Sequence, residues 1–247
     1  MPVGLLLIHA FPLDATMWQP QTASLNDMIT TVAPNFPGFG GTPGVGSVTS
    51  MESMADVCIR ALDEAHLDSA VVCGLSMGGY AALAFWRKYP GRVAGLVLAN
   101  TRAGADDEAG KGRRADLATR LRAEGNDFLV QNPPPLLSAN SPQVLVNLVK
   151  QTIASQPAEA IAAASLGMAE RPDAMPWLKE IAVPTLVITS GGDALIPPHV
   201  TKETADAIPD AVFREIPGVG HLSNLEAPEA FNDLIREHLA RCGVIAG

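Results

Sequence analysis

Three residues of the sequence have the types and the order along the chain that nucleophilic catalysis needs: Ser76, Asp193 and His221. A serine hydroxyl at its ordinary pKa is a poor nucleophile and requires a base that takes its proton. A histidine can act as that base when a carboxylate holds its ring in the right tautomer and stabilises the imidazolium. The sequence therefore contains a candidate set for acyl transfer, provided that the fold brings these side chains to one place.

Ser76 stands at the centre of a G-x-S-x-G segment whose glycines are Gly74 and Gly78. The apolar run Ala70 to Gly74 precedes the serine, and a helical pattern from Met77 to Tyr89 follows it. A sharp strand-to-helix turn leaves no room for side chains at the flanking positions and holds the serine above the sheet edge. The alternative, a glycine-rich phosphate loop, lacks both the G-x-G-x-x-G spacing and a following Gly-Lys-Ser/Thr. We therefore expect Ser76 to be the nucleophile.

His221 is the expected base among the five histidines. It stands in a glycine-rich loop after the last predicted strand, and in a parallel sheet the loops after different strands meet at one edge. His66 and His238 fall on amphipathic helical patterns and are expected at the partly exposed surface, while His199 follows two prolines at a helix start. His9 ends the first predicted strand and is expected to brace the following loop rather than react.

Asp193 is the expected acid because it directly follows the predicted strand from Thr185 to Thr189. Asp206 and Asp210 flank the next helical pattern and suit capping or solvated roles. The predicted strand that ends at Asn100 has no adjacent carboxylate. Serine, aspartate and histidine then appear in the order that a strand–turn–helix nucleophile requires.

The tetrahedral intermediate of acyl transfer also needs two preorganised N–H donors for its oxyanion. The backbone N–H of Met77, directly after the nucleophile, is one candidate. The second is expected from the loop after the first strand, where Phe11 can donate and Pro12 has no N–H. The alternative for this loop is a buried segment without a catalytic purpose.

Along the chain, short apolar runs alternate with longer helical patterns such as Ser50 to His66. This alternation predicts a mostly parallel sheet with helices on both faces, which would position the candidate residues. This is an α/β fold with about six strands. The runs are Val3 to Ile8, Ile29 to Ala33, Ala70 to Gly74, Leu96 to Asn100, Thr185 to Thr189 and Val212 to Ile216.

Residues 101–181 interrupt this alternation and are expected to form a helical lid inserted into a core domain of residues 1–100 and 182–247. Helical patterns occur at 113–122, 143–154 and 159–168, and three prolines at 133–135 separate the first two because consecutive prolines cannot continue a helix.

Within this insertion, three apolar side chains are candidates for substrate contacts: Phe128, Leu145 and Trp177. Packing of the insertion onto the core explains each of them equally well.

Composition limits the function further. The 247 residues carry a net charge of -9, with 26 acidic against 17 basic residues, which argues against nucleic-acid binding. Cys58, Cys73 and Cys242 are too widely spaced for a disulfide framework or a zinc site, so a cytoplasmic protein is expected. No run approaches a membrane span, and Val3 to Ile8 lacks the basic start of a signal peptide. No H-E-x-x-H segment or ligand cluster appears, so neither metal nor cofactor is expected.

With these residues in place, the sequence resembles the α/β-hydrolase family along nearly its whole length, and within it the 3-oxoadipate enol-lactonases and small carboxylesterases. The matching segments are His9-Ala-Phe-Pro-Leu-Asp14, Phe36-Pro-Gly-Phe-Gly-Gly41, Gly74-Leu-Ser-Met-Gly-Gly79, Gly192-Asp193 and Gly220-His-Leu-Ser-Asn-Leu-Glu226. The resemblance implies the same triad and the same two oxyanion amides. The sequence departs from the family in lacking the usual opening strand pair, in Ala10 where glycine is frequent, and in Asn35 where an aspartate is frequent.

The expected function is hydrolysis of small carboxylic esters or lactones through an acyl-enzyme on Ser76. The alternatives are a cofactor-independent haloperoxidase or perhydrolase, a carbon–carbon bond hydrolase, an N-acyl homoserine lactonase, and a ligand-binding protein of the same fold without catalysis. A haloalkane dehalogenase is disfavoured because it would carry an aspartate in place of Ser76. The expected partner is a small molecule, and the sequence does not predict an oligomeric state.

Overall fold

The computed structural model describes residues 2–44 and 46–246. Its sheet has the strand order β2-β1-β3-β4-β5-β6, and every pair of neighbours is parallel. The strands are β1 (Val3–Ile8), β2 (Thr31–Val32), β3 (Ser69–Leu75), β4 (Val93–Ala99), β5 (Thr185–Ser190) and β6 (Ala211–Ile216). All six predicted strands are present in this part of the chain, and the α/β fold class is confirmed.

Strand β2 is shorter than the predicted run from Ile29 to Ala33. It pairs with β1 through Thr31 and Val32 only, and Pro34 stands two residues after Val32. Proline has no N–H to donate to a ladder, so pairing ends before it.

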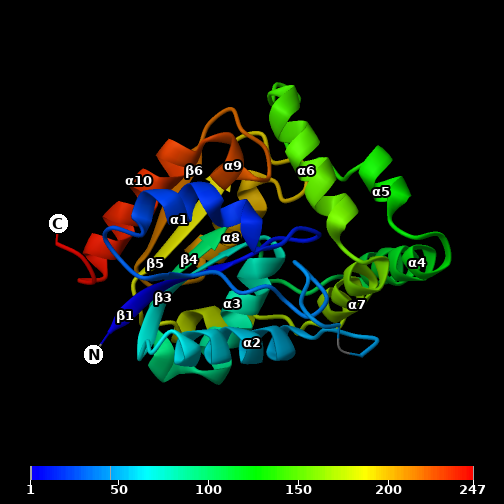
Figure 1. Cartoon of the computed structure of the whole chain (residues 1–247). Coiled ribbons are helices and arrows are strands. Elements are labelled where there is room, and N and C mark those ends of the chain that lie inside the picture. The colour runs from blue at the N-terminus through cyan, green and yellow to red at the C-terminus, as the bar shows by residue number, and fades with distance from the viewer. Residues whose placement is uncertain (1, 45, 247) are drawn as a thin grey trace.

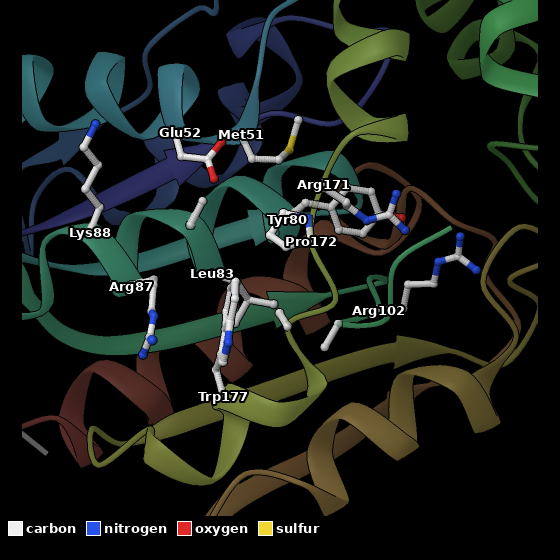
Figure 2. Close-up of a pocket in the computed structure, with 13 residues that line it drawn as sticks. Met51, Glu52, Tyr80, Leu83, Arg87, Lys88, Arg102, Arg171, Pro172 and Trp177 are labelled. Carbon is white, nitrogen blue, oxygen red and sulfur yellow. The ribbon is translucent and has the colours of Figure 1, made fainter. Parts of the chain in front are cut away.

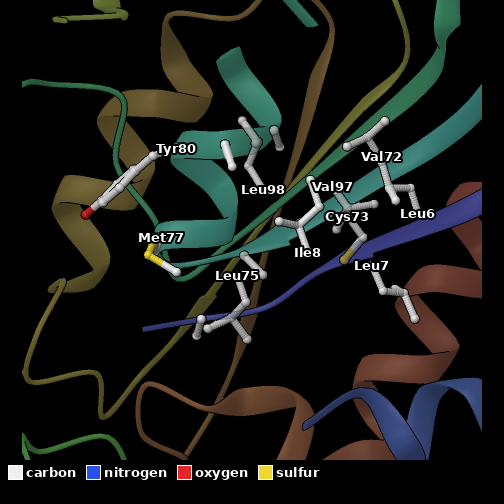
Figure 3. Packing of buried hydrophobic residues seen from close by; sticks show 14 of the residues in the cluster. Leu6, Leu7, Ile8, Val72, Cys73, Leu75, Met77, Tyr80, Val97 and Leu98 are labelled. Carbon is white, nitrogen blue, oxygen red and sulfur yellow. The ribbon is translucent and has the colours of Figure 1, made fainter. Parts of the chain in front are cut away.

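The central strands are buried on both faces, which explains why their sequences are almost continuously apolar. Figure 3 shows Ile8 of β1, Val72 of β3 and Val97 of β4 packed in one cluster, and all three are fully buried. Edge strand β6 instead carries the exposed residues Arg214 and Glu215, and a charged edge resists pairing with other chains. The hydrophobic core therefore lies along the central strands β1, β3, β4 and β5.

Helices cover both faces of this sheet. Helices α1 and α10 pack against each other on one face, and α2 and α3 on the other (Figure 1). Helix α2 begins where the Ser50 hydroxyl accepts a hydrogen bond from the N–H of Ser53, a standard N-cap contact. The core helices are α1 (Gln19–Leu25), α2 (Met51–Glu64), α3 (Met77–Lys88), α8 (Pro198–Asp206), α9 (Ser223–Glu226) and α10 (Pro228–Arg241), with short 3-10 turns η1 (Ala15–Trp18) and η2 (Pro90–Arg92).

Between β4 and β5, four helices form a layer beyond the carboxyl ends of the strands (Figure 1). They are α4 (Glu108–Glu124), α5 (Asp127–Gln131), α6 (Gln143–Ser155) and α7 (Ala158–Ala169), followed by the 3-10 turn η3 (Met175–Glu180). Helices α4, α6 and α7 lie on the three predicted helical patterns, whereas the short α5 was not predicted. The boundaries of a lid domain and its role as a lid stay predictions.

Three further observations concern membranes, metals and thiols. Within residues 2–44 and 46–246, no helix combines the length and the apolar character needed to span a membrane. The same residues contain no group of three metal-ligating side chains placed to hold one ion.

Cys58, Cys73 and Cys242 are all free thiols, and burial raises the pKa of each.

His238 is buried, so its predicted partly exposed position is wrong. It is 3% exposed on α10, and its Nε2 lies 3.5 Å from the Sγ of Cys242. The facing position of β4 is Gly95, where an added Cβ would lie 3.4 Å from the same nitrogen. The missing side chain at Gly95 leaves room for the imidazole, which amphipathic spacing alone does not reveal.

We expect the free energy of unfolding to decrease as the pH falls from about 6.5 to about 4. Burial lowers the pKa of both His9 and His238 to about 4. Across this window the unfolded chain binds protons that the folded chain excludes, so stability present above the unfolded pKa is lost as the pH falls. Each histidine contributes at most about 3 kcal/mol to the decrease.

Urea denaturation at about pH 7 and about pH 4.5 measures this effect, because most carboxylates stay ionised in that range. In a His238→Asn variant the decrease should be smaller. A pH dependence identical to that of the original protein would contradict a neutral, buried His238.

Candidate active site

Ser76 occupies a strained turn between β3 and α3. Its φ of 57° and ψ of -117° lie outside the regions that ordinary side chains prefer. The turn is fixed by a hydrogen bond from the N–H of Ser76 to the carbonyl of Ala99, 2.9 Å long. A Cβ on Gly74 would lie 2.1 Å from the carbonyl oxygen of Gly78, and one on Gly78 would lie 2.1 Å from that of Ile8. Both glycines are therefore required by close backbone approach, as the motif predicts.

Asp193 and His221 form a buried pair. The distance from His221 Nδ1 to Asp193 Oδ2 is 2.8 Å. His221 is 1% exposed and Asp193 is 4% exposed. Asp193 Oδ1 accepts hydrogen bonds from the backbone N–H groups of Leu195 and Ile196, each 2.9 Å long. Burial alone would raise the pKa of Asp193, but the hydrogen bond and charge of His221 and the other donors outweigh it and lower the pKa. The carboxylate is therefore ionised and can hold the imidazole in place.

Asn100 supports this pair and was not predicted as part of the site. Its Nδ2 donates to Asp193 Oδ2 and to the hydroxyl of Ser190, both over 2.9 Å, and its Oδ1 accepts from the hydroxyl of Ser223 at 2.7 Å. The residue is fully buried and has a positive φ of 46°. The sequence does contain a signal for this role, because Asn100 is a polar residue at the carboxyl end of an apolar predicted strand.

Ser76 and His221 line one cavity of about 380 Å³. Because Asp193 engages Nδ1 of His221, Nε2 is the ring nitrogen left to accept the serine proton. Among the described residues no hydrogen bond joins Ser76 Oγ to this nitrogen. Catalytic hydrogen bonds are often long in ligand-free sites and tighten when substrate binds.

The two predicted oxyanion donors remain available in the structure. Neither the N–H of Phe11 nor that of Met77 donates a hydrogen bond to another residue of the described chain. Met77 is the first residue of α3, where helix N–H groups lack an intrahelical partner and the helix dipole favours negative charge. Phe11 lines the cavity that contains Ser76.

His9 lies beneath the loop that carries Phe11. Its Nε2 accepts a hydrogen bond from the N–H of Phe36 at 3.2 Å, so the ring proton is on Nδ1, which donates to the carbonyl of Ala10 at 3.1 Å. Burial lowers its pKa to about 4, which keeps the ring neutral. These contacts match the predicted bracing role.

Glu226 joins the His221 loop to the helical insertion, and the sequence alone suggested no role for it. Its carboxylate accepts hydrogen bonds from the N–H of Gly220 at 2.8 Å, the N–H of Ser138 at 3.1 Å and the hydroxyl of Ser141 at 2.6 Å. The insertion therefore directly supports the loop that carries the expected base.

The three predicted substrate-contact residues lie away from the cavity at Ser76. The ring of Phe128 lies under the guanidinium of Arg120, 3.8 Å from the ring centroid, and Trp177 lines a different cavity. Leu145 is half-buried on α6. The residues that do line the cavity are Phe11, Ser76, Tyr80, Arg102, Asp106, Gly110, Arg113, Arg114, Leu117, Pro134, Leu136, Met168, Leu195, Ile196 and His221.

The second cavity, about 270 Å³ in volume, is mostly apolar and lies between α2, α3 and η3 (Figure 2). It contains none of the three predicted catalytic residues. It adjoins the first cavity, because Tyr80 and Arg102 line both. The first cavity is the candidate active site because Ser76 and His221, the predicted nucleophile and base, line it.

Comparison with known proteins shows the family of the chain. Residues 5–234 match the family described as the alpha/beta hydrolase family. A thermophilic esterase from Thermogutta terrifontis, solved with malate bound, is 41% identical, with 98% of this chain and 90% of that chain covered and a TM-score of 0.91. The enol-lactonase from Burkholderia xenovorans LB400 is 25% identical, with 97% and 91% covered and a TM-score of 0.88.

A Mycobacterium tuberculosis protein named as a non-heme bromoperoxidase is 30% identical, with 82% of this chain and 80% of that protein covered. The predicted resemblance to enol-lactonases and small esterases is confirmed by these relatives. The chain belongs to the alpha/beta hydrolase family.

Proposed function

We propose that the protein hydrolyses small carboxylic esters or lactones through an acyl-enzyme on Ser76. The proposal depends chiefly on the ionised Asp193 paired with His221 at 2.8 Å, in a site where His221 and Ser76 line one cavity. Ester hydrolysis as the general reaction agrees with the family and with the esterase and enol-lactonase among the relatives.

In this mechanism Ser76 Oγ attacks the carbonyl carbon while its proton passes to His221 Nε2. The N–H groups of Phe11 and Met77 bind the resulting oxyanion. Collapse of the intermediate breaks the bond to the leaving alcohol, which takes the proton from His221. Water then repeats the sequence on the acyl-enzyme and releases the acid and free Ser76.

A perhydrolase or haloperoxidase is the second candidate, favoured by the relative named as a bromoperoxidase. Perhydrolysis would use the same acyl-enzyme, with hydrogen peroxide in place of water as the second nucleophile. A non-catalytic binding protein, the other alternative, would show no turnover with either nucleophile.

We expect short esters and small lactones to be better substrates than long-chain esters. A cavity of about 380 Å³ is at the small end of ligand sites. The test is kcat/KM for p-nitrophenyl esters from acetate to palmitate, with an enol-lactone and an N-acyl homoserine lactone measured alongside. A maximum at about twelve carbons or more, with interfacial activation, would indicate a lipase and contradict the proposed substrate size.

A further inference from the structure

One side of helix α3 leads from the nucleophile to the second cavity. Tyr80 and Ala84 follow Ser76 at steps of four residues, and side chains at this spacing lie on the same side of a helix. Tyr80 lines both cavities, whereas Ala84 and its neighbour Leu83 line only the second (Figure 2). The boundary between the two cavities therefore lies about one helical turn beyond Ser76, roughly 6 Å along the helix axis.

The ring of Tyr80 is held in place at this boundary. The guanidinium of Arg171 lies over the ring, 4.1 Å from its centroid, and both residues are buried (Figure 2). Arg171 is itself fixed, because it donates hydrogen bonds to the carbonyls of Met168 at 2.7 Å and Gly104 at 2.9 Å. It also forms an ion pair with Asp106 over 2.9 Å. Tyr80 therefore forms a fixed part of the wall between the cavities.

The lining of the second cavity suits an uncharged alkyl chain. The surface is mostly apolar, with Leu83 and Trp177 among the side chains that form it. Its basic side chains are already paired with carboxylates: Arg87 with Glu180, Lys88 with Asp56, and Arg102 and Arg171 with Asp106. Because these charges are compensated within the protein, the cavity does not require an anionic ligand. Transfer of methylene groups from water to such a surface is favourable.

We propose that the second cavity is an alkyl-binding extension of the active site, closed by the ring of Tyr80, and that this side chain sets the upper limit on the chain length of the substrate. With the scissile carbonyl at Ser76, a linear alkyl chain that runs along α3 meets the ring after about one helical turn. Removal of the ring would join the two cavities and admit the rest of the chain. The inference rests on the proposed esterase function and names a residue that determines its specificity.

The test compares the chain-length profile of kcat/KM in the original protein and in Tyr80→Ala. For the acid half the substrates are p-nitrophenyl esters from acetate to dodecanoate, and for the alcohol half they are alkyl acetates from ethyl to dodecyl, followed by release of acetate. In the original protein kcat/KM should fall beyond the short members of both series. In Tyr80→Ala each methylene that enters the second cavity should raise kcat/KM about fourfold. The ratio of the octyl-length member to the shortest member should therefore rise at least about tenfold in one series.

Three further variants show where the chain binds. Ala84→Phe places a ring in the second cavity, so in the Tyr80→Ala background it should return the ratio to its original value, and alone it should leave the ratio unchanged. Tyr89→Ala is the matched control and should also leave the ratio unchanged, because Tyr89, the only other tyrosine, lines neither cavity. Tyr80→Leu keeps a buried apolar side chain and should give a smaller increase. It carries the test if Tyr80→Ala does not fold by circular dichroism.

Three results would overturn the inference while the esterase function stands. The original protein could hydrolyse the octyl-length esters as well as the shortest ones. The ratio could stay unaltered in both series in the folded Tyr80 variants, which would mean that Tyr80 does not limit chain length. The ratio could rise in Tyr80→Ala but persist when Ala84→Phe is added, which would mean that the chain does not enter the second cavity. If the original protein hydrolyses no ester of either series, the proposed function itself fails.

Discussion

Replacement of Ser76 by alanine is expected to lower kcat by a factor on the order of 10⁶, because loss of a triad nucleophile removes the covalent pathway entirely. The fold should persist, since Ser76 makes its structural contacts through backbone atoms: its N–H donates to Ala99 and its carbonyl accepts from Gly79 and Thr101. Initial rates with a short p-nitrophenyl ester measure the loss, and circular dichroism checks the fold.

Ser47→Ala provides the matched control. Ser47 is exposed, and its hydroxyl makes no hydrogen bond in the part of the chain that the structure describes. This variant should retain full activity. A Ser76→Ala enzyme that kept more than a few per cent of the original rate would show that another group is the nucleophile.

Asp193→Asn is expected to lower kcat by roughly 10⁴, the second-largest effect. All four contacts of the Asp193 carboxylate require an acceptor: Oδ1 faces the N–H groups of Leu195 and Ile196, and Oδ2 faces His221 Nδ1 and Asn100 Nδ2. An asparagine has only one oxygen, so its amino group must face two donors in either orientation. If it faces His221, the ring must move its proton to Nε2 and can no longer accept one from Ser76.

Asp206→Asn is the matched control for this substitution. Asp206 is exposed and pairs with Lys202 on the surface, where such a pair contributes about 0–1 kcal/mol. Its loss should leave kcat nearly unchanged. The opposite ranking of the two variants would mean that Asp193 is not the acid.

The sequence predicted those features of the site that are determined by a single strand, turn or helix and by the order of the strands. The strand–turn–helix pattern around Ser76 requires Gly74 and Gly78 through local backbone contact, so the motif predicts the turn directly. Asp193 and His221 each follow a predicted strand, and the parallel sheet brings the ends of β5 and β6 to the same edge. Residue type and sheet topology were sufficient there.

Contacts between distant segments were not predictable in this way. Asn100 donates a hydrogen bond to Asp193, which is 93 residues away in the sequence, and Glu226 accepts one from Ser138, which is 88 residues away. The burial of His238 depends on a glycine in a strand far away in the sequence. Phe128 and Trp177 are apolar, as expected of pocket residues, but the packing of the insertion places them outside the cavity at Ser76. Several arginines line that cavity, which the sequence did not predict.

The departure at Asn35 shows how a local difference can preserve a contact. Asn35 Oδ1 accepts a hydrogen bond from the N–H of Ala15 at 2.7 Å. An aspartate oxygen at this position could accept the same bond. The substitution therefore keeps the link between this loop and the segment after Phe11, and the structure gives no reason to expect an altered triad.

The central claim is that Ser76 is a nucleophile activated by His221, and covalent labelling tests it most directly. The protein is incubated with a fluorophosphonate, which reacts with activated serine hydroxyls, and the modified peptide is identified by mass spectrometry. We expect one adduct per chain, located on Ser76, with labelling lost in Ser76→Ala and strongly slowed in His221→Ala. An adduct on a different residue, or no adduct in a preparation that hydrolyses esters, would contradict the proposed mechanism.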